Sequence, residues 1–381
     1  MNPEENKILL LDAANQNTLA IVRHLGKKGY IIHLCGYQKA SLALFSKYSS
    51  KKFIIHEPSK YEAEFMDDLV KILSAEKYLL VMPVGFKSYK ACARHQELIK
   101  KYTNLIITSN ENIELASDKR RTNEVAERLG VPVPRTFVPL SIEEVEKLPL
   151  SFPCVIKAPF ESGKNIVTYA SNREELMSRF SGMVTKNNFK SPDLPIVQEY
   201  IVGGGYGFFA YYDNGVCKRT FTHHRIREYP VTGGASVCAE SFHDPKLNEY
   251  GTKILDALKW NGVAMVEFKK DNNDGIYKLM EINPKFWGSL ELALSSGVEF
   301  DEMLIQKARG EEIAVSDKFN DTTFQWVLNG ELFHGLERPW TIPRIIGTLF
   351  YSKKDWRLLD PLPNLYQLAY IFVHYYKKLK G

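Results

Sequence analysis

The amino-acid sequence predicts a parallel α/β region at the N-terminus, an α+β region after it, and a helical C-terminal extension. Over roughly the first 110 residues short apolar runs alternate with helical patterns, as in a doubly wound parallel sheet. From about residue 152, strand-like runs follow one another, and a cluster of turn-forming residues at 271–275 joins two of them. The chain ends in an aromatic and apolar run at 365–376, followed by lysines.

Length and composition are those of a globular protein with two or three domains. The chain has 381 residues, of which 44% are hydrophobic and 25% are charged. Its five cysteines are scattered and include no Cys-x-x-Cys, which favours a reducing, cytoplasmic setting and argues against zinc. No basic and apolar leader precedes the first strand-like run, so secretion is not expected.

The N-terminal region, which we place at residues 1–113, repeats a strand–helix–strand pattern. Strands are expected at 7–11, 30–35, 53–56 and 78–83, and helices at 19–26 and 62–75. Gly-x-Gly-x-x-Gly is absent after the first strand, so a dinucleotide site is not supported. Ligands of such sheets bind at the carboxyl ends of the strands, which makes the loop 83–88 a candidate; a plain connecting loop is an equal alternative.

The second region, residues 114–315, has a different pattern. A capped helix is expected at 116–130 and an extended lead at 131–137, followed by a strand at 152–159 and a loop at 160–165. A strand from 196 continues into a glycine stretch that ends at 207, and we expect a hinge between two subdomains near 198–204. An antiparallel run covers 208–221, and helices are expected at 290–296 and 301–309.

The hairpin around residues 271–275 carries the most informative residues of the chain. Folding it about Asp274 places Glu267 opposite Glu281, and Asn283 lies on the same face two residues on. Two facing carboxylates repel each other unless a cation neutralises them. Two carboxylates and an amide oxygen suit Mg²⁺, which usually shares its remaining positions with water and phosphates. The alternative is a solvated glutamate pair bound to nearby lysines, Lys269 and Lys278.

Taken in order, these pieces resemble the ATP-grasp superfamily over about residues 1–310, in particular carboxylate–amine ligases with a carbamoyl-phosphate-synthase-like core. Five elements fall in the order and spacing of that superfamily. The resemblance implies an α/β N-terminal doubly wound domain followed by an α+β ATP-grasp fold, and beyond it we expect a C-terminal helical extension at 316–381. Two features depart from the family pattern: the loop 160–165 has a single glycine, Gly163, and Lys285 stands where most relatives carry arginine.

The resemblance also implies which residues bind ATP. Lys119 and Lys157 would contact the α- and β-phosphates, and the loop around Gly163 would close over them with backbone N–H groups. Lys157 lies inside an apolar strand, where an unpaired ammonium is costly. The hinge strand would hold the adenine and ribose through Gln198, Glu199, Tyr200 and Ile201.

Three basic residues are the expected catalytic groups. Arg225 and Arg227 are two residues apart on a strand, so we expect both on one face, able to hold phosphoryl oxygens. Lys285 would complete a cationic ring beside the metal ligands Glu267, Glu281 and Asn283. A solvated arginine face is the alternative for the first two.

The implied activity is an ATP-dependent, ADP-forming ligase that uses Mg²⁺, with Mn²⁺ as a second candidate metal. A carboxylate would be activated as an acyl phosphate and joined to an amine, or to a thiol. The alternatives are a bicarbonate-activating carboxylase and a nucleotide-binding assembly or regulatory protein without turnover. The partners expected are small-molecule carboxylates and amines and no nucleic acid. The sequence leaves both substrates and the oligomeric state open, with a homodimer as one alternative.

The C-terminal extension is not explained by this resemblance. From Arg338 onward there are eight basic residues against two acidic ones, interleaved with aromatic residues. The apolar run at 365–376 is shorter than the roughly 20 residues needed to span a bilayer. Packing of this helix on the core is the preferred interpretation, and peripheral contact with the inner face of an anionic membrane is the alternative.

Overall fold

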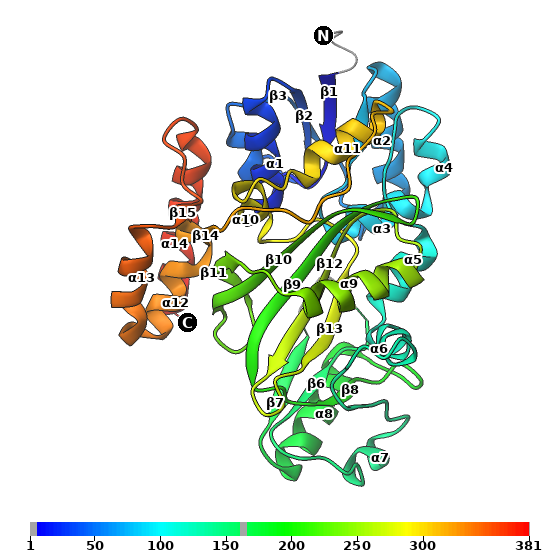
Figure 1. The fold of residues 1–381 in the computed structure, drawn as a ribbon, viewed down its shortest axis with the longest axis vertical. Helices are drawn as coiled ribbons and strands as arrows, with labels where there is room; N and C mark the ends of the chain where they lie inside the picture. Colours follow the sequence, from blue (N-terminus) through cyan, green and yellow to red (C-terminus); the bar gives the residue numbers. More distant parts are fainter. Residues whose placement is uncertain (1–5, 161–165, 381) are drawn as a thin grey trace.

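The computed structural model describes residues 6–160 and 166–380, and the side chains of these residues except 374–380. Three sheets form the body of the molecule, and a group of helices stands at one side of it (Figure 1). A parallel sheet lies at the top of the view, a large mostly antiparallel sheet in the middle and a small antiparallel sheet at the bottom (Figure 1). The boundaries at 113 and 315 stay a prediction.

The parallel sheet confirms the doubly wound N-terminal fold. Its strand order is β3-β2-β1-β4, so the chain steps outward from β1 to β3 and then returns to the other side of β1. The carboxyl ends of β1 and β4 therefore flank the topological switch point, where such sheets bind ligands. The strands are β1 Lys7–Leu10, β2 Ile31–Gly36, β3 Ser49–Ile54 and β4 Leu80–Met82, and the helices of this part are α1 Gln16–Lys27, η2 Leu42–Phe45, α2 Glu62–Ala75, α3 Phe86–Arg94, α4 Gln96–Ile99 and α5 Asn110–Ser117.

The small sheet is built from residues between 136 and 199. Its order is β5-β8-β6-β7, and the apolar side of β6 packs on a helix through Cys154, Ile156 and Phe180. The elements of this part are α6 Lys119–Arg128, β5 Thr136–Phe137, α7 Ile142–Glu146, β6 Cys154–Lys157, β7 Val167–Ala170, α8 Arg173–Asn187 and β8 Ile196–Glu199.

The large sheet has seven strands in the order β13-β12-β9-β10-β11-β14-β15. One face joins the parallel sheet through a shared core that includes Phe209, Met265 and Trp287. The other face packs against α9, through residues such as Phe208 and Leu247. The elements are β9 Gly203–Asp213, β10 Val216–Tyr229, β11 Ala235–Ser241, α9 Pro245–Ala257, β12 Gly262–Asp271, β13 Tyr277–Asn283, α10 Leu290–Ser295, α11 Phe300–Ala308, β14 Thr323–Gln325 and β15 Lys353–Lys354.

The C-terminal extension is helical, as expected, but two short strands tie it to the large sheet. β14 pairs with β11, and β15 pairs with β14 at the edge. The helices are η3 Val327–Glu331, α12 Leu332–Glu337, η4 Pro339–Thr341, α13 Ile342–Leu349 and α14 Pro361–Lys380. Across the described residues, no helix combines the length and apolar character that crossing a membrane requires.

Two predicted segments differ from the structure. The single helix expected at 116–130 is divided at Asp118, whose side chain caps α6 by accepting from the backbone N–H of Arg120 at 2.9 Å. The glycine stretch after residue 202 is the start of β9 and not a loop. A Cβ on Gly203 would lie 1.7 Å from the carbonyl oxygen of Lys270 on β12, so glycine is there for a close approach between strands.

Candidate functional site

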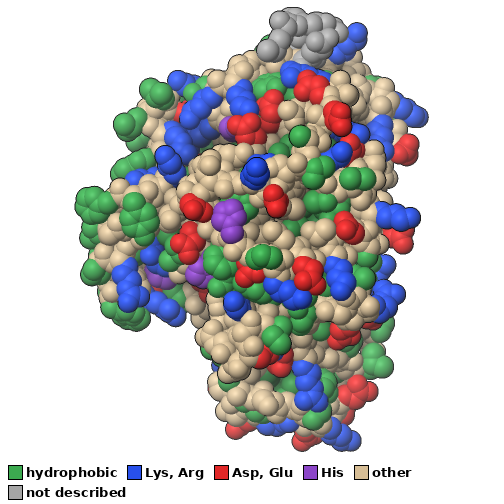
Figure 2. Space-filling view, in the orientation of Figure 1, with side chains coloured by type: hydrophobic (Ala, Val, Ile, Leu, Met, Phe, Trp, Pro, Cys, Tyr) green, Lys and Arg blue, Asp and Glu red, His purple; other side chains and the backbone are tan. Residues whose placement is uncertain are grey.

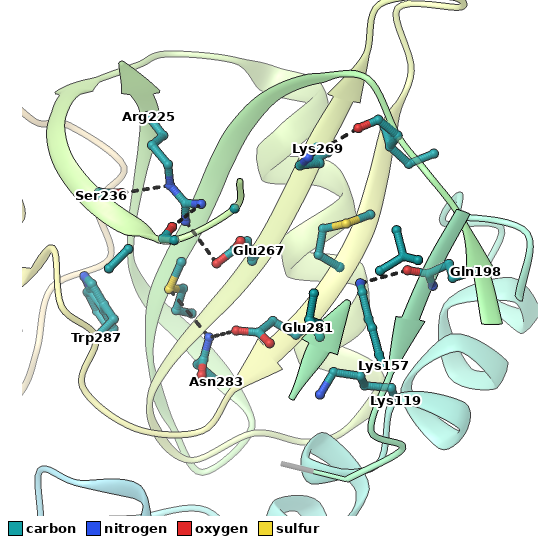
Figure 3. Close-up of a pocket in the computed structure, with 18 of the residues that line it drawn as sticks. Lys119, Lys157, Gln198, Arg225, Ser236, Glu267, Lys269, Glu281, Asn283 and Trp287 are labelled. Atoms are coloured by element: carbon teal, nitrogen blue, oxygen red, sulfur yellow. Dashed lines mark hydrogen bonds and ion pairs between the residues drawn. The ribbon is translucent and has the colours of Figure 1, made fainter. Parts of the chain in front are cut away.

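A cavity of about 590 Å³ lies between the small sheet and the large sheet. Side chains from β6 and β8 line one wall, and side chains from β12 and β13 line the opposite wall. Figure 3 shows Glu267 and Glu281 in the middle, Arg225 on one side, and Lys119 and Lys157 on the other. The cavity brings together all but two of the predicted site residues: Lys119, Lys157, Gln198, Glu199, Tyr200, Ile201, Arg225, Glu267, Glu281, Asn283 and Lys285. Of the two others, Gly163 lies outside the described residues and Arg227 lies elsewhere.

The two carboxylates face each other as the hairpin register predicts. Glu267 on β12 is the direct partner of Glu281 on β13, and Met265 is the partner of Asn283. The Asn283 amide donates to Glu281 Oε1 at 2.7 Å, which holds these two side chains of β13 side by side. A bulge lies between this pair and the turn, because Phe268 pairs with Leu279 and leaves Met280 as an extra residue, which brings Glu281 opposite Glu267. The bulge lets Met280 and Glu281, although adjacent in sequence, line the same cavity.

Arg225 supplies the positive charge beside this pair. Its guanidinium lies 3.2 Å from Glu267 Oε2 and donates to Ser236 Oγ at 2.9 Å and to the Gly234 carbonyl at 3.1 Å. Burial raises the pKa of Glu267; Arg225 lowers it and Glu281 raises it further. A second cation near Glu281 would relieve this repulsion. Among the described residues no cluster of three or more His, Cys, Asp and Glu side chains could hold a metal. The oxygen atoms available to a cation at this place are those of two carboxylates and one amide, from Glu267, Glu281 and Asn283.

Lys157 projects from β6 into the opposite wall. Its ammonium donates to Gln198 Oε1 at 2.8 Å, and the Gln198 amide donates to Thr136 Oγ1 at 2.8 Å, which fixes the orientation of both side chains. Burial and then the neighbouring charge of Lys119 lower the pKa of Lys157 to about 8. An anionic ligand beside Lys157 would therefore stabilise its protonated form.

This pKa gives a pH prediction for Lys157. An anionic ligand such as ATP should bind more weakly as pH rises through about 8, by up to about tenfold per pH unit, because the neutral amine predominates there. The stability of the protein without ligand depends on pH in the opposite direction. Between about pH 8 and pH 10.4 the unfolded chain binds more protons than the folded one, so the contribution of Lys157 to the free energy of unfolding rises with pH. ATP-induced thermal shifts at pH 7 and pH 9 measure the first effect. Lys157→Met should remove the pH dependence, and equal shifts for the natural protein at both pH values would contradict it.

The strand β8 and the residues after it form the edge of the cavity. Glu199 lies 3.2 Å from Lys278, which also pairs with Asp271 at 2.7 Å. The ammonium of Lys269 donates to the Ile201 carbonyl at 3.3 Å and lies 5.3 Å from the centre of the Tyr200 ring. Both lysines therefore bind the hinge segment, whereas the alternative of a solvated pair placed them on Glu267 and Glu281.

Arg227 does not share the face of Arg225, and that expectation is wrong. The register between β10 and β11 shifts on either side of Arg227, which breaks the alternation of side chains. Arg227 instead pairs with the fully buried Glu331 and donates to Thr348 Oγ1 at 3.1 Å, so it binds the C-terminal extension. Burial raises the pKa of Glu331 to about 6 even with this partner.

Arg227→Ala should therefore destabilise the protein and leave the chemistry of the cavity unchanged. Removing one partner of a buried ion pair costs about 3–5 kcal/mol, since the remaining charge stays buried. Urea unfolding at pH 7 measures the loss, which should shrink near pH 5 because Glu331 can then be protonated. Arg227→Lys, which keeps the charge, should lose less. An Arg227→Ala variant that is as stable as the natural protein but inactive would contradict this structural role and support a catalytic one.

A second cavity of about 670 Å³ adjoins the first and shares Lys285 and Gly288 with it. It lies at the carboxyl ends of β1 and β4, and the predicted loop 83–88 lines it through Val84, Gly85, Phe86 and Lys87. Asp12, with a φ of 66°, anchors this loop: its carboxylate accepts from the backbone N–H groups of Val84 at 3.0 Å and of Gly85 at 2.7 Å. The C-terminal extension contributes Asn329 to the lining.

Several lining residues could not be found from the sequence. Val155 and Met280 add to the apolar walls of the first cavity, and Ser236 fixes Arg225. For Met280 the sequence indicates the wrong face of the strand, because strict alternation of side chains places it on the face opposite Glu281. Asn15, Asn17 and Asn329 of the second cavity have no motif, and their proximity depends on how distant segments pack.

Comparisons with known proteins agree with this geometry. Residues 224–329 match a family model described as ATP-grasp in the biosynthetic pathway with Ter operon. The chain is 23% identical over 263 residues to carbamoyl phosphate synthase large chains of Thermoanaerobacter sp. (strain X514) and Caldanaerobacter subterraneus, a match that covers 66% of this chain and 24% of each relative. The chain thus spans about a quarter of the length of the curated relatives it matches.

Solved structures with the same fold cover most of the chain. Biotin carboxylase of Campylobacter jejuni has a TM-score of 0.69 at 18% identity and covers 85% of this chain and 76% of its own. N5-carboxyaminoimidazole synthetase of Staphylococcus aureus has a TM-score of 0.67 at 15% identity, with 87% and 85% covered. L-amino acid ligase of Bacillus licheniformis has a TM-score of 0.62 at 16% identity, with 80% and 74% covered.

The chain therefore has the ATP-grasp fold, and the resemblance predicted from its motifs is confirmed. Within that superfamily its sequence relatives are carbamoyl phosphate synthase large chains, and its structural relatives include carboxylases as well as ligases.

Proposed function

We propose that this protein is an ATP-dependent, ADP-forming ligase that joins a carboxylate to an amine. The carboxylate would attack the γ-phosphate of ATP to give an acyl phosphate and ADP, and the amine would then displace phosphate. A thiol could replace the amine in the second step. The observation that carries the proposal is the facing pair Glu267 and Glu281, set in a cavity with Arg225, Lys119 and Lys157 around it.

Mg²⁺ fits the donors at this pair, with Mn²⁺ as a second candidate. Glu267, Glu281 and Asn283 offer hard oxygen atoms on one wall, and a cation there would offset the repulsion by which Glu281, in addition to burial, raises the pKa of Glu267. A bound divalent cation would supply charge to neutralise the phosphates. Arg225, held by Ser236 and Gly234, is placed to stabilise negative charge on the phosphoryl group during transfer.

The nucleotide would lie between the two sheets. Val155, Ile201 and Met280 form apolar surfaces suited to the faces of a base, and the hinge residues 198–201 offer polar groups at its edge. Lys157 and Lys119, from the small sheet, would contact the α- and β-phosphates. On this arrangement the γ-phosphate points toward Lys285, where the two cavities meet.

The second cavity is the proposed place for the substrate carboxylate or amine. It meets the first at Lys285 and Gly288, and its lining includes the amides of Asn15, Asn17 and Asn329 and side chains of both signs of charge. Such a lining suits a polar small molecule better than an apolar one. A cytoplasmic location and a homodimer remain part of the proposal.

A carboxylase that activates bicarbonate is the second candidate, because biotin carboxylase is among the structural relatives. A nucleotide-binding protein without turnover is the third. ADP release measured with ATP and Mg²⁺ separates them, using no addition, bicarbonate, single carboxylates, and carboxylates paired with amino acids. A ligase needs a carboxylate and releases ADP fastest with its amine present, a carboxylase responds to bicarbonate alone, and a protein without turnover releases none in any mixture. Glu281→Gln protein gives the background.

A further inference from the structure

We propose that the C-terminal extension docks this protein onto an anionic membrane surface. The docking surface consists of the exposed apolar side chains of the segment 336–373, together with the basic side chains beside them. This inference does not depend on the proposed reaction. The extension has two different sides: one packs on the body, and the other is exposed.

One side of the extension is fixed firmly to the body. Arg23 of α1 pairs with Asp360 at 2.9 Å and donates to the Asp355 carbonyl at 3.0 Å. The ring of Tyr366 stacks on Phe45 with centroids 5.0 Å apart. Packing of α14 on the core, the preferred interpretation of the sequence, is therefore confirmed for this side. These contacts hold the extension against the body and set the orientation of its outer side.

The outer side is apolar to an unusual degree. Leu358 is 90% exposed, Phe350 is 87% exposed and Leu359 is 74% exposed. Figure 2 shows hydrophobic side chains protruding at the left margin, where Figure 1 places the C-terminal helices. Other large apolar side chains of the same segment are also exposed: Leu336, Trp340, Ile342, Ile346, Tyr351, Trp356, Leu362, Leu365, Tyr370, Phe372 and Val373. Contiguous exposed apolar surface of this kind marks an interaction site.

The exposed residues of α14 follow a helical period. Leu362, Leu365, Phe372 and Val373 recur at spacings that place them along one side of the helix, and all four are exposed. Gln367 of the same helix is buried against the body. A helix with one side packed on protein and the other side apolar and exposed lies well in a membrane interface.

The charges around this surface are mostly positive. Within 336–373 the exposed charged side chains are Arg338, Arg344 and Lys353 against one acidic residue, Glu337. The two other acidic residues, Asp355 and Asp360, are turned inward and buried. Two more exposed basic residues, Lys27 and Lys47, lie in the body near α1 and η2. Lys47 is next to the extension, because its backbone N–H donates to Asp360 at 2.9 Å. Basic residues of this kind are attracted to anionic lipid headgroups.

A membrane fits this surface better than a second copy of the chain. The most exposed side chains stand out from the surface instead of lining a groove, and the exposed residues include Trp340 and Trp356, a residue type enriched at membrane–water interfaces. Two like basic rims would also repel each other across a symmetric dimer interface. Apolar side chains that protrude beside basic residues can insert between lipid headgroups, where the basic residues remain in contact with phosphate.

Cosedimentation with vesicles tests the proposal on the full chain. We expect binding to vesicles of phosphatidylcholine with about a third phosphatidylglycerol at low salt, and at least tenfold weaker binding to phosphatidylcholine alone. Binding should fall when salt is raised. Phe350→Ser with Leu358→Ser and Leu359→Ser should reduce it at least tenfold, and Arg344→Gln with Lys353→Gln by roughly fivefold per residue removed.

Matched controls use exposed residues elsewhere. Leu140→Ser with Val315→Ser removes apolar side chains that are 54% and 73% exposed, and Lys186→Gln with Lys190→Gln removes exposed charges of the α8 region. Both should bind like the natural protein, and all variants should keep its unfolding temperature. Protein that stays in the supernatant with anionic vesicles at low salt overturns the proposal. So does a dimer in solution that the Phe350, Leu358 and Leu359 substitutions dissociate, because a second copy would then cover this surface.

Discussion

Replacing Glu281 by glutamine should lower ATP turnover by about a hundredfold to a thousandfold while the protein stays folded. A neutral amide cannot balance the charge of a divalent cation, and such a cation contributes several kcal/mol to phosphoryl transfer, where each 1.4 kcal/mol is about tenfold. Steady-state ADP release at saturating ATP and Mg²⁺ measures the effect. Because Glu281 raises the pKa of the half-buried Glu267, its removal should leave the unliganded protein at least as stable as before.

Glu249→Gln is the matched control, since this side chain lies exposed on α9, away from both cavities. It should release ADP at the natural rate. If folded Glu281→Gln protein turned over at the same rate as this control, the facing carboxylates would not hold the metal, and the ligase proposal would lose its main support.

Arg225→Ala should depress turnover by on the order of a thousandfold, the scale on which arginines that neutralise a transferring phosphoryl group act. Most of the loss should appear in kcat and little in the affinity for ATP, because the charge that Arg225 meets grows during transfer. ATP affinity by calorimetry, set beside kcat, separates the two. Glu267 would lose its cation, so the variant should also be less stable without Mg²⁺.

Arg225→Lys tests whether geometry or charge matters. Lysine keeps the positive charge but cannot hold Ser236, the Gly234 carbonyl and Glu267 with one planar group, so turnover should recover only in part. A variant with normal kcat and weakened ATP binding would make Arg225 a binding residue and not a catalytic one.

The main features of the site could be read from the sequence because they depend on local geometry. Folding the hairpin about Asp274 predicted the pairing of Glu267 with Glu281, and the structure has this pairing, although the extra residue Met280 contributes to the register. Lys157 could be placed because an ionisable residue inside an apolar strand requires a partner. The parallel N-terminal sheet followed from alternating strand and helix patterns, which are also local.

The remaining features depend on small irregularities and on distant contacts. A bulge on β10 separates Arg225 from Arg227, and a bulge on β13 brings Met280 beside Glu281; one extra residue in a strand leaves no clear mark in its sequence. Arg227 could not be assigned to Glu331 because the two are 104 positions apart. The loop 160–165, with Gly163, lies outside the described residues, so its predicted role is untested.

Asn329 connects the C-terminal extension to the second cavity. Its amide donates to Asp355 at 2.9 Å inside the extension, and the same residue lines the second cavity opposite Asp12 and Asn17 of the N-terminal region. The wall of that cavity is therefore assembled from the two ends of the polypeptide. A fragment that ends before residue 316 would keep the strands β6, β8, β12 and β13 that line the first cavity but would lose Asn329 from the lining of the second. Grafting a different extension onto this body would accordingly alter which molecules fit.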